Sequence, residues 1–374
     1  MTERVDFAVI GGGAMGSAAA WQLARRGREV ALLERFDPGH ANGASHGPSR
    51  NFNVAYDCEP YLGLLTEASR LWEELEAESG AHMLDRVGMV THGGTGEYPE
   101  LAAGLAAGIP GRVLSPGEAG ERFPGLRFQT PVLWNETGGR LNADAAVAAL
   151  QRAAAARGAV VRHRSRVTAL EPRGDRVLIA TEGGSLEASV AIVALGAWTS
   201  KLLAGLVPLP PLVVTQEQPA HFALRSDGAD ASRSWPGFNH RPRPSGDEWW
   251  LTPIYGMYTP GFGVKAGWHG SGPVTDPDAR TFQPELAQLE ALRRYAAEWL
   301  PGADPDRFEP ISCTYTTTPD HDFVLDRVAR IVVAAGFSGH GFKFTPAIGR
   351  LLADVATGEA DAAPAAFRLD RFQA

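Results

Sequence analysis

Three glycines near the N-terminus have the spacing of a phosphate-binding turn. Gly11, Gly13 and Gly16 form G-x-G-x-x-G directly after an apolar run at 5–10, and residues 14–26 have the periodicity of a helix. The first glycine permits a tight turn, the second lets a pyrophosphate approach the backbone, and the third lets the helix pack closely on the strand. The positive end of the helix then faces the phosphates.

An acidic residue completes this pattern. A second short strand at 30–33 ends at Glu34, which lies 23 residues after Gly11. A carboxylate at this place accepts hydrogen bonds from a ribose, so the strand, turn, helix and acid together predict a dinucleotide site. NAD and FAD both use this unit. The run A-I-V-A-L-G-A-W at 191–198 and the glycine-rich loop before the last helix favour FAD.

Lysine and cysteine are both scarce. Of the 35 basic residues, only Lys201, Lys265 and Lys343 are lysines, which marks them as places where the planar guanidinium of arginine does not serve. The two cysteines, Cys58 and Cys313, exclude a disulfide framework and a cysteine-rich metal site. We therefore expect no metal and a reducing, cytoplasmic location.

The composition excludes several classes of protein. Hydrophobic residues make up 44% and charged residues 21%, as in ordinary globular proteins. The net charge is −8 without a basic block, so nucleic acid is not an expected partner. No uncharged apolar run approaches the ~18 residues of a membrane span. The apolar run at 7–10 is too short for a signal peptide.

The order of elements indicates an α/β fold with an insertion. Apolar spacing and turn residues predict helices at 60–79, 144–157, 285–299 and 346–357, and strands at 159–170, 176–181, 186–195 and 328–335. Asn142 or Asp144 is the expected cap of the second of these helices. Thr345 is the expected cap of the last, with Pro346 at its first position and Gly358 after its end.

Proline and tryptophan become frequent after residue 208, and the α/β pattern returns after 316. We predict a Rossmann-like FAD-binding domain interrupted by a mainly antiparallel β-sheet substrate domain with one helix. The FAD-binding domain comprises 1–215 and 316–374. The substrate domain comprises 216–315, and residues of about 83–135 can also contribute to it.

Longer motifs point to a family. They are A-S-H-G-P-S-R at 44–50 with A-Y at 55–56, C-T-Y-T-T-T-P-D-H-D-F at 313–323, G-F-S-G-H-G-F-K-F at 336–344, G-x-K-x-G-x-H at 263–269, and F-R-L-D-R-F-Q at 367–373. Together they resemble the monomeric sarcosine oxidase and N-methyltryptophan oxidase family, FAD-dependent amine oxidases of the D-amino-acid oxidase-like superfamily. The resemblance spans nearly the whole chain.

The resemblance implies a covalent cofactor and an oxygen site. Cys313 would carry FAD through a thioether to its 8α carbon, whereas Cys58 lacks such a context and is expected to be structural. Lys265 would lie over the flavin face near N5, where oxygen reacts. A fixed positive charge there stabilises the anion that forms as O2 takes up an electron, which lowers the barrier by about 3 kcal/mol or more.

The resemblance also implies the substrate site and the rest of the cofactor site. Lys343 would hold the substrate carboxylate, and the substrate pocket would be lined by Tyr255, His269 and Tyr315. The flavin ring would contact His46, Arg50, Gly339, His340, Gly341 and Phe342. Other residues assigned to the cofactor site are Ala14, Met15, Arg35, Ser45, Val167, Gly196 and Trp198.

One position departs from the family. A second arginine, three residues after the one at Arg50, usually helps to bind the carboxylate, and here this position is Asn53. A hydrogen bond to a charged group contributes about 1.5–3 kcal/mol, so a small substrate such as sarcosine would lose most. Either Lys343 holds the carboxylate with another group, Arg241 and Arg243 being candidates, or the substrate is larger.

We therefore expect a flavin-dependent oxidase of a secondary amine or imino acid that passes a hydride equivalent from the carbon beside nitrogen to flavin N5. The products would be an imine and hydrogen peroxide, and the partners a small-molecule amine and O2, with the protein a monomer. The alternatives are a biosynthetic oxidase of a bulkier or cyclic amine, a flavin dehydrogenase that passes electrons to a partner protein, a nicotinamide dehydrogenase, and a non-catalytic flavoprotein.

Overall fold

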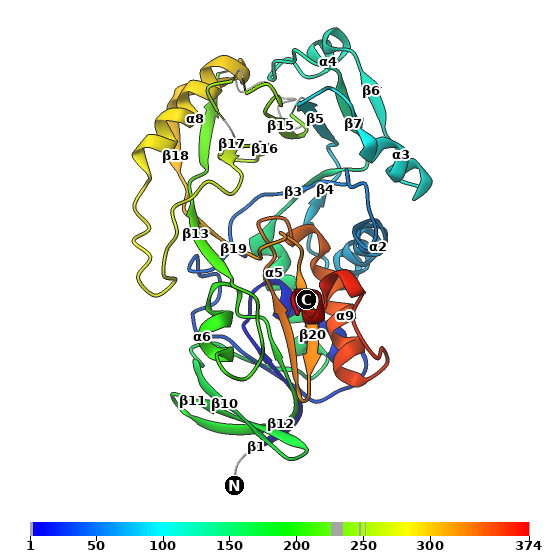
Figure 1. Ribbon diagram of the computed structural model, residues 1–374, viewed down its shortest axis with the longest axis vertical. Helices are drawn as coiled ribbons and strands as arrows, with labels where there is room; N and C mark the ends of the chain where they lie inside the picture. The colour runs from blue at the N-terminus through cyan, green and yellow to red at the C-terminus, as the bar shows by residue number, and fades with distance from the viewer. Residues whose placement is uncertain (1–2, 226–234, 247, 251, 374) are drawn as a thin grey trace.

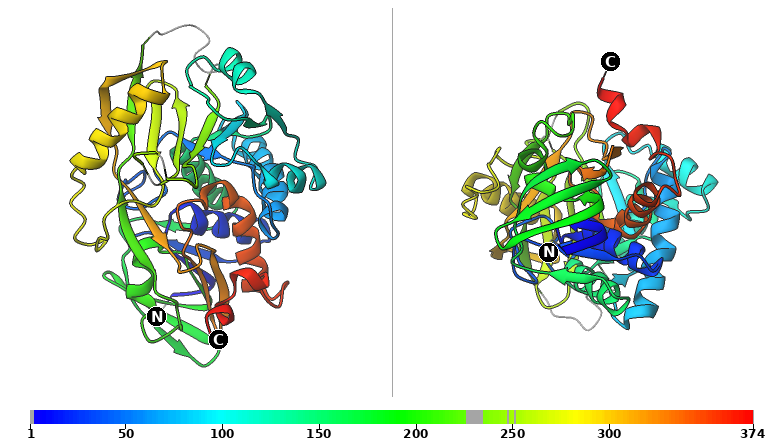
Figure 2. Two further views of the ribbon diagram at one scale, coloured as in Figure 1. Left: turned by 45° about the horizontal axis from the view of Figure 1, so that its top comes forward. Right: turned by 90° about the horizontal axis from the view of Figure 1, so that it is seen from below.

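The computed structural model describes residues 3–225, 235–246, 248–250 and 252–373. Two large sheets lie at opposite ends of an elongated molecule, and long strands cross between them (Figures 1 and 2). The N-terminal and C-terminal elements share the lower half of Figure 1, while the middle of the chain forms the upper half. The chain thus leaves the first sheet, builds the second, and returns.

The first sheet is built on parallel strands. Its central strand β1 pairs in parallel with β2 and β12, and β12 also pairs in parallel with β21. Phe7 and Val9 of β1 face one core cluster and Ala8 and Ile10 face the other, as expected of a sheet covered on both sides. In spatial order the strands are β10 (Val167–Arg173), β11 (Arg176–Thr181), β12 (Gly184–Val193), β1 (Glu3–Ile10), β2 (Val30–Leu33) and β9 (Val160–Arg162). In addition, β21 (Ile331–Ala335) pairs with β12, and β20 (Val324–Val328) pairs with β21.

Four long helices lie on one side of this sheet and against one another (Figure 1). The buried faces of the first of these helices and of the one at residues 143–156 are rich in alanine, and such small side chains let helix axes approach closely. Helix α1 (Ala14–Arg25) packs against α5 (Ala143–Ala156) and α9 (Thr345–Thr357), and α2 (Tyr61–Ser79) packs against the last two. The opposite side carries the 3₁₀ turn η1 (Gly196–Trp198), α6 (Thr199–Leu203) and the C-terminal turn η4 (Leu369–Phe372). The turn η3 (Ala365–Phe367) places Phe367 in the core on the side of the four helices.

The second sheet is antiparallel except where β15 meets β5. Helix α8 (Leu286–Trp299) packs against it. The strands, in spatial order, are β18 (Ala303–Pro310), β14 (Ala220–Leu224), β17 (Gly263–Trp268), β16 (Ile254–Thr259), β15 (Gly237–Arg241), β5 (Met89–Gly93), β7 (Val132–Asn135) and β6 (Arg112–Leu114). Two short helices, α3 (Pro99–Ala106) and α4 (Pro116–Arg122), lie beside β6 and β7.

Two small sheets connect the halves. Strands β13 (Val213–Glu217) and β19 (Cys313–Thr317) run antiparallel between the large sheets, and their register sets Cys313 opposite Glu217. Strand β8 (Gly139–Leu141) pairs with both β3 (Arg50–Phe52) and β4 (Leu84–Asp85). These connections carry the motif residues to the boundary between the two halves.

Most elements expected from the sequence are confirmed, with three corrections. Thr345 is the first residue of α9 and its hydroxyl donates to the Phe342 carbonyl, so it is not the N-cap and Pro346 stands at the second position instead of the first. The strand expected at 159–170 is two strands, β9 and β10. The strand expected at 328–335 is the second arm of a hairpin, β20–β21. Asn142 does cap α5, since its Oδ1 accepts from the Ala145 amide.

No helix in the described part of the chain is both long and apolar enough to span a bilayer.

A buried histidine pair lies between the second sheet and α8. The rings of His92 and His240 stack with centroids 3.9 Å apart, and His240 Nδ1 lies 3.0 Å from Tyr295 Oη. Burial lowers the pKa of His92 to about 3 and also lowers the pKa of His240. Both rings are therefore neutral in the folded protein at neutral pH.

This pair predicts a pH dependence of stability. Each histidine is protonated near pH 6.5 in the unfolded chain, whereas in the fold His92 is protonated only near pH 3 and the pKa of His240 is likewise lowered. The stability that depends on the neutral rings is therefore complete above pH 6.5 and is lost as the pH falls. We expect His92→Leu to reduce the loss of unfolding free energy between pH 7 and pH 5 by roughly 2 kcal/mol. Urea unfolding at both pH values measures this difference. An equal loss in the variant and the wild type would contradict it.

Candidate active site

The glycine turn between β1 and α1 is shaped for an anion. Gly11 has φ +105°, a conformation that glycine adopts without strain. A Cβ on Gly16 would lie 1.9 Å from the Gly11 carbonyl oxygen, so only glycine lets α1 start this close to β1. Gly13 is the N-cap and offers no side-chain acceptor. The Ala14 amide donates to Ser45 Oγ at 3.0 Å, so the amides that follow it in the first turn of α1 are the ones available to a bound phosphate.

Glu34 is buried directly below this turn. Its Oε2 accepts from the Gly12 amide at 2.7 Å and its Oε1 accepts from the Phe36 amide at 2.8 Å. Burial raises the pKa of Glu34, but hydrogen bonds from His40, Phe36 and Gly12 outweigh burial and lower it. The carboxylate is therefore ionised and fixed at the end of β2, as an acceptor for ribose hydroxyls must be.

A cavity of about 430 Å³ extends from this turn to β19. Its walls come from both ends of the chain and from the second sheet's connections. The expected cofactor residues that line it, with one expected substrate residue, are Gly11, Gly13, Ala14, Met15, Glu34, Arg35, Ser45, Arg50, Val167, Gly196, Trp198, Cys313, Tyr315, Gly339, Gly341 and Phe342. Gly16 supports the turn from behind, and His46, His340, Lys343, Lys265, His269, Tyr255 and Asn53 do not line this cavity.

Sequence reasoning missed the group that closes one side of the cavity. Asp278 accepts hydrogen bonds from Arg35 at 2.7 Å, Trp198 Nε1 at 2.8 Å and Lys201 Nζ at 2.6 Å. The hydrogen bond from Lys201 is the largest cause of the lowered pKa of Asp278. The segment after β17 thus reaches from the second sheet to the first. The scarcity of lysine was the one available signal, because it marked Lys201.

Cys313 is buried at the start of β19, on the cavity wall. Arg50 Nη2 lies 3.9 Å from its Sγ, and the same guanidinium donates to the carbonyls of Ser49 and Ala44. Arg50 is held by carbonyls rather than by a carboxylate in these contacts, so its charge is directed at the sulfur. Cys58 is exposed, and partial desolvation of its sulfur, together with nearby acids such as Asp57, raises the pKa of its thiol.

Lys265 lies on β17, opposite His221 of β14. Its Nζ donates to the Ser49 carbonyl at 3.3 Å. Burial, followed by the charge of Arg50, lowers the pKa of Lys265 to about 7. Nearby, burial and Arg50 lower the pKa of His46 to about 3, and the buried Nε2 of His46 has no hydrogen-bond partner.

Three aromatic residues expected in the substrate pocket lie together. The hydroxyl of Tyr315 is 3.3 Å from His269 Nδ1, and the ring centroids of Tyr255 and His269 are 6.5 Å apart. A Cβ on Gly339 would lie 2.2 Å from the Tyr315 ring, so this glycine lets the glycine-rich loop touch β19. Burial and the charge of Lys343 lower the pKa of His269 to about 4, which keeps it neutral.

Lys343 belongs to the turn η2 (Phe342–Phe344), and η2 contacts β3. Its side chain is buried, and burial lowers its pKa to about 7.

Asn53 follows β3 directly, and its Oδ1 accepts from the Ala55 amide at 3.1 Å. Arg241 pairs with Glu100 and Arg243 pairs with Glu248. Both guanidiniums are thus engaged by carboxylates rather than replacing the missing arginine.

The residues present fit an FAD. The cavity has a glycine turn at the start of α1 for the pyrophosphate and an ionised acid for a ribose. Its other end holds Cys313, with the orphaned Nε2 of His46 and the cations Arg50 and Lys265 nearby. A donor set rich in cations and neutral histidines suits a ring that becomes negative when it is reduced.

Comparisons with known proteins agree with this geometry. The family model described as FAD dependent oxidoreductase matches residues 6–355. The chain is 33% identical to the monomeric sarcosine oxidase of Bacillus sp. strain B-0618, over 99% of this chain and 97% of that protein. It is 28% identical to the N-methyl-L-tryptophan oxidase of Salmonella agona, over 99% of each chain. Among solved structures it is similar to NikD, an unusual amino acid oxidase essential for nikkomycin biosynthesis, with a TM-score of 0.83, 27% identity, and coverage of 96% of this chain and 95% of that chain.

Proposed function

We propose, from the premise that this chain belongs to the FAD dependent oxidoreductases and among them to the family of monomeric sarcosine oxidase, that it oxidises a secondary amine or imino acid with O2 as the acceptor. The observation that carries the proposal is the grouping around the Cys313 end of the cavity. Tyr315 lies on the cavity wall and contacts His269, the charge of buried Lys343 acts on His269, and buried Lys265 interacts electrostatically with Cys313. Two of the chain's three lysines occupy these places.

The side chains prepare an amine for oxidation. A bound FAD would supply the electron acceptor for this chemistry: it would take a hydride equivalent from the carbon beside nitrogen, and its reoxidation would reduce O2 to hydrogen peroxide. Lys343 holds a carboxylate of the substrate, and His269 with Tyr315 borders the reacting carbon. The cationic and dry surroundings lower the pKa of the bound amine, which favours its neutral, reactive form.

Lys265 serves the second half of the reaction. Negative charge develops as O2 takes up electrons, and a fixed ammonium group in a dry site stabilises that charge without reorganising. Burial makes Lys265 an effective donor for this purpose because little water screens its charge.

We further propose a covalent link between Cys313 Sγ and the 8α carbon of FAD, supported by the position of the buried sulfur on the cavity wall beside Arg50. The cofactor then rests on residues 1–215 and 316–374, and the substrate on 216–315 with strands from 83–135. We propose that the protein is a cytoplasmic monomer. Size-exclusion chromatography with light scattering tests the monomeric state.

The absence of an arginine at position 53 predicts a substrate preference. Asn53→Arg places a second guanidinium after β3, near the turn that carries Lys343. A charge-assisted hydrogen bond to the carboxylate contributes about 1.5–3 kcal/mol, so kcat/KM for sarcosine should rise roughly 10-fold to 100-fold. Steady-state peroxide production with sarcosine measures the change. An Asn53→Gln variant is the control, and an equal gain in both would contradict the charge argument.

A second candidate is the oxidation of a bulkier or cyclic imino acid in a biosynthetic route. Asn53 favours it, because a larger substrate gains affinity from contacts other than the carboxylate. A screen of sarcosine, N-methyltryptophan, proline, pipecolate and bulky cyclic amines, read out by peroxide, separates the candidates. Oxidation of a cyclic amine alone would select the second, and no peroxide with any amine would refute both.

A further inference from the structure

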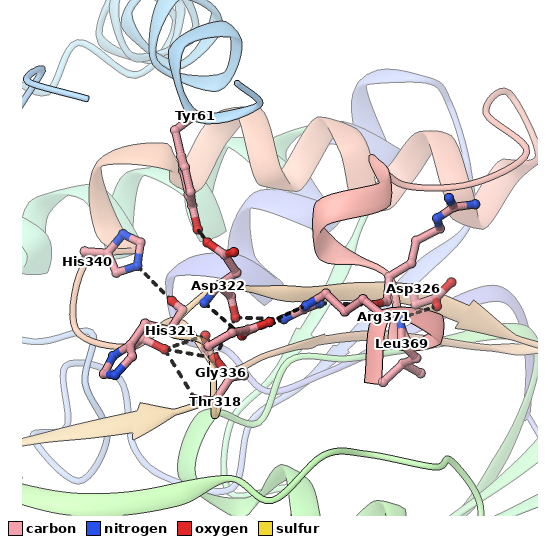
Figure 3. Close-up of polar contacts among 12 residues, drawn as sticks. Tyr61, Thr318, His321, Asp322, Asp326, Gly336, His340, Leu369 and Arg371 are labelled. Carbon is pink, nitrogen blue, oxygen red and sulfur yellow. Dashed lines mark hydrogen bonds and ion pairs between the residues drawn. The ribbon is translucent and has the colours of Figure 1, made fainter. Parts of the chain in front are cut away.

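A chain of hydrogen bonds links Lys343 to the backbone of the 318–323 turn. Lys343 Nζ donates to Tyr56 Oη at 3.1 Å and to the His340 carbonyl at 2.5 Å. Tyr56 Oη lies 3.1 Å from His340 Nδ1. The other ring nitrogen, His340 Nε2, lies 3.2 Å from the His321 carbonyl oxygen, as Figure 3 shows.

The proton positions along this chain of hydrogen bonds follow from its last acceptor, the His321 carbonyl. Burial lowers the pKa of His340 to about 3, so the ring is neutral and carries one N–H. A carbonyl oxygen only accepts, so that N–H is on Nε2 and Nδ1 bears a lone pair. The Tyr56 hydroxyl must then donate to Nδ1. Its oxygen is left as an acceptor, and Lys343 is the donor that faces it.

Counting N–H groups on Lys343 gives the consequence. An ammonium has three, and two are used by Tyr56 and His340, the two acceptors of Nζ in the described part of the chain. The third is free for an anion. A neutral amine has only two N–H groups, and with both used, a lone pair would face the anion instead.

We propose that Tyr56 and His340 are positioning residues that fix the direction of this hydrogen-bond chain, from Lys343 to the His321 carbonyl, and so reserve one N–H of Lys343 for a carboxylate of the substrate. The carboxylate as ligand rests on the proposed function. The direction of the chain does not, because it follows from the protein's own atoms.

The turn that carries the His321 carbonyl is braced from several sides (Figure 3). Arg371 Nη2 donates to the Asp322 carbonyl at 3.1 Å, and the same guanidinium binds both carboxylate oxygens of Asp320. Tyr61 Oη donates to Asp322 Oδ1 at 2.6 Å, and Thr318 Oγ1 donates to the Asp322 carbonyl at 2.7 Å. The acceptor that sets the direction of the chain is therefore held by the C-terminal turn and by α2.

The charges around Lys343 leave it open to an anion. His269, which follows β17, and His340 in the glycine-rich loop both interact electrostatically with Lys343, and His321 in the braced turn interacts with these two histidines. Tyr56, just before α2, is the other titratable contact, and burial raises its pKa, so it stays a neutral hydroxyl. No carboxylate is among the causes that shift the pKa of Lys343. A bound carboxylate would thus be its first negative partner among the described residues.

The direction of the chain is tested on His340 itself. Long-range proton–nitrogen NMR correlation on the holoenzyme labelled with ¹⁵N-histidine reports which ring nitrogen carries the proton, and His340→Gln identifies the signal by its loss. We expect the Nε2–H form at neutral pH. An Nδ1–H ring, or a charged one, would overturn the proposal.

The effect on Lys343 is tested with ¹³Cε-lysine, because only three signals arise and Lys343→Met identifies one. Tyr56→Phe keeps the ring that lies 5.3 Å from Nζ and removes only the acceptor. We expect the titration midpoint of Lys343 to fall by about one to two pH units. Tyr98→Phe removes a hydroxyl that donates to the distant Pro131 carbonyl and should not move it. An unchanged midpoint in Tyr56→Phe would overturn the proposal.

Acetate is the probe for the free N–H. Its binding to the holoenzyme, followed by the Lys343 signal, should weaken about tenfold per pH unit above the midpoint, since the ammonium form is needed. Tyr56→Phe should weaken it 10-fold to 100-fold at pH 8. Acetate could leave the Lys343 signal unmoved while the His340 tautomer and the Lys343 titration midpoint in Tyr56→Phe are as expected. That result would refute the binding of a carboxylate by Lys343 and would leave the direction of the hydrogen-bond chain supported.

Discussion

Replacing Lys265 by methionine is expected to slow the reaction of the reduced enzyme with O2 by roughly 10²-fold to 10³-fold, the range seen when one charged or polar donor is removed from a preorganised site. The physical reason is that Lys265 is buried, so its charge acts on the developing anion with little screening. Methionine has a similar length and no charge. Stopped-flow mixing of the substrate-reduced enzyme with oxygenated buffer measures the rate.

The same experiment contains its own control. Reduction by the amine without oxygen should change only a few-fold, because the amine is held by other groups. The oxygen rate of the wild type should also fall as the pH rises through the pKa of Lys265, which is about 7 and rises when an anion lies beside it. This dependence should vanish in Lys265→Met. Equal slowing of both half-reactions would refute the oxygen role.

Replacing Cys313 by alanine is expected to abolish retention of the flavin by the denatured protein. Sγ is the atom proposed to form the thioether, and without it FAD is held only by noncovalent contacts that acid destroys. The change should be complete rather than graded. Acid precipitation followed by absorbance of the pellet and the supernatant, together with the intact mass, measures it.

Cys58→Ala is the matched control for this variant. Cys58 is exposed, so its loss should leave the colour in the pellet. Retention of flavin in the pellet of Cys313→Ala would refute the attachment site. Release in both variants would point to loss of fold instead, which circular dichroism of the native samples would detect.

Much of the cofactor site could be predicted because its signals are local. The sequence of apolar run, glycine turn, helix and acid at 5–34 needs only neighbouring residues to form, since backbone hydrogen bonds and close packing set it. The same holds for the cap at Asn142, confirmed by its bond to Ala145. The glycine at 339 was placed by its motif, and the structure supplies the reason, which is the Tyr315 ring against it.

Other features depended on contacts between distant parts of the chain. Asp278 closes the cavity by accepting a hydrogen bond from Arg35, which lies some 240 positions earlier in the chain. No local sequence pattern marks Asp278 for this contact. The sequence predicted that residues of about 83–135 can contribute to the domain of the second sheet, but not the way in which they do so: β5, β7 and β6 join that sheet through the parallel pairing of β5 with β15. Hydrophobic periodicity gives the type of an element but not its neighbour, because pairing is decided by the shape and burial of faces that meet only after folding.

The amino-acid sequence alone determined the dinucleotide turn, the family and the identity of the three lysines. Only the tertiary structure decided which groups Lys343 contacts, because folding brings Tyr56 from the N-terminal part of the chain to Lys343 and His340. It likewise decided that Arg241 and Arg243 are bound to acids and do not replace the arginine absent at Asn53. A residue's type limits its chemistry, whereas its charge state and free protons are set by burial and by neighbours that folding brings within a few ångströms.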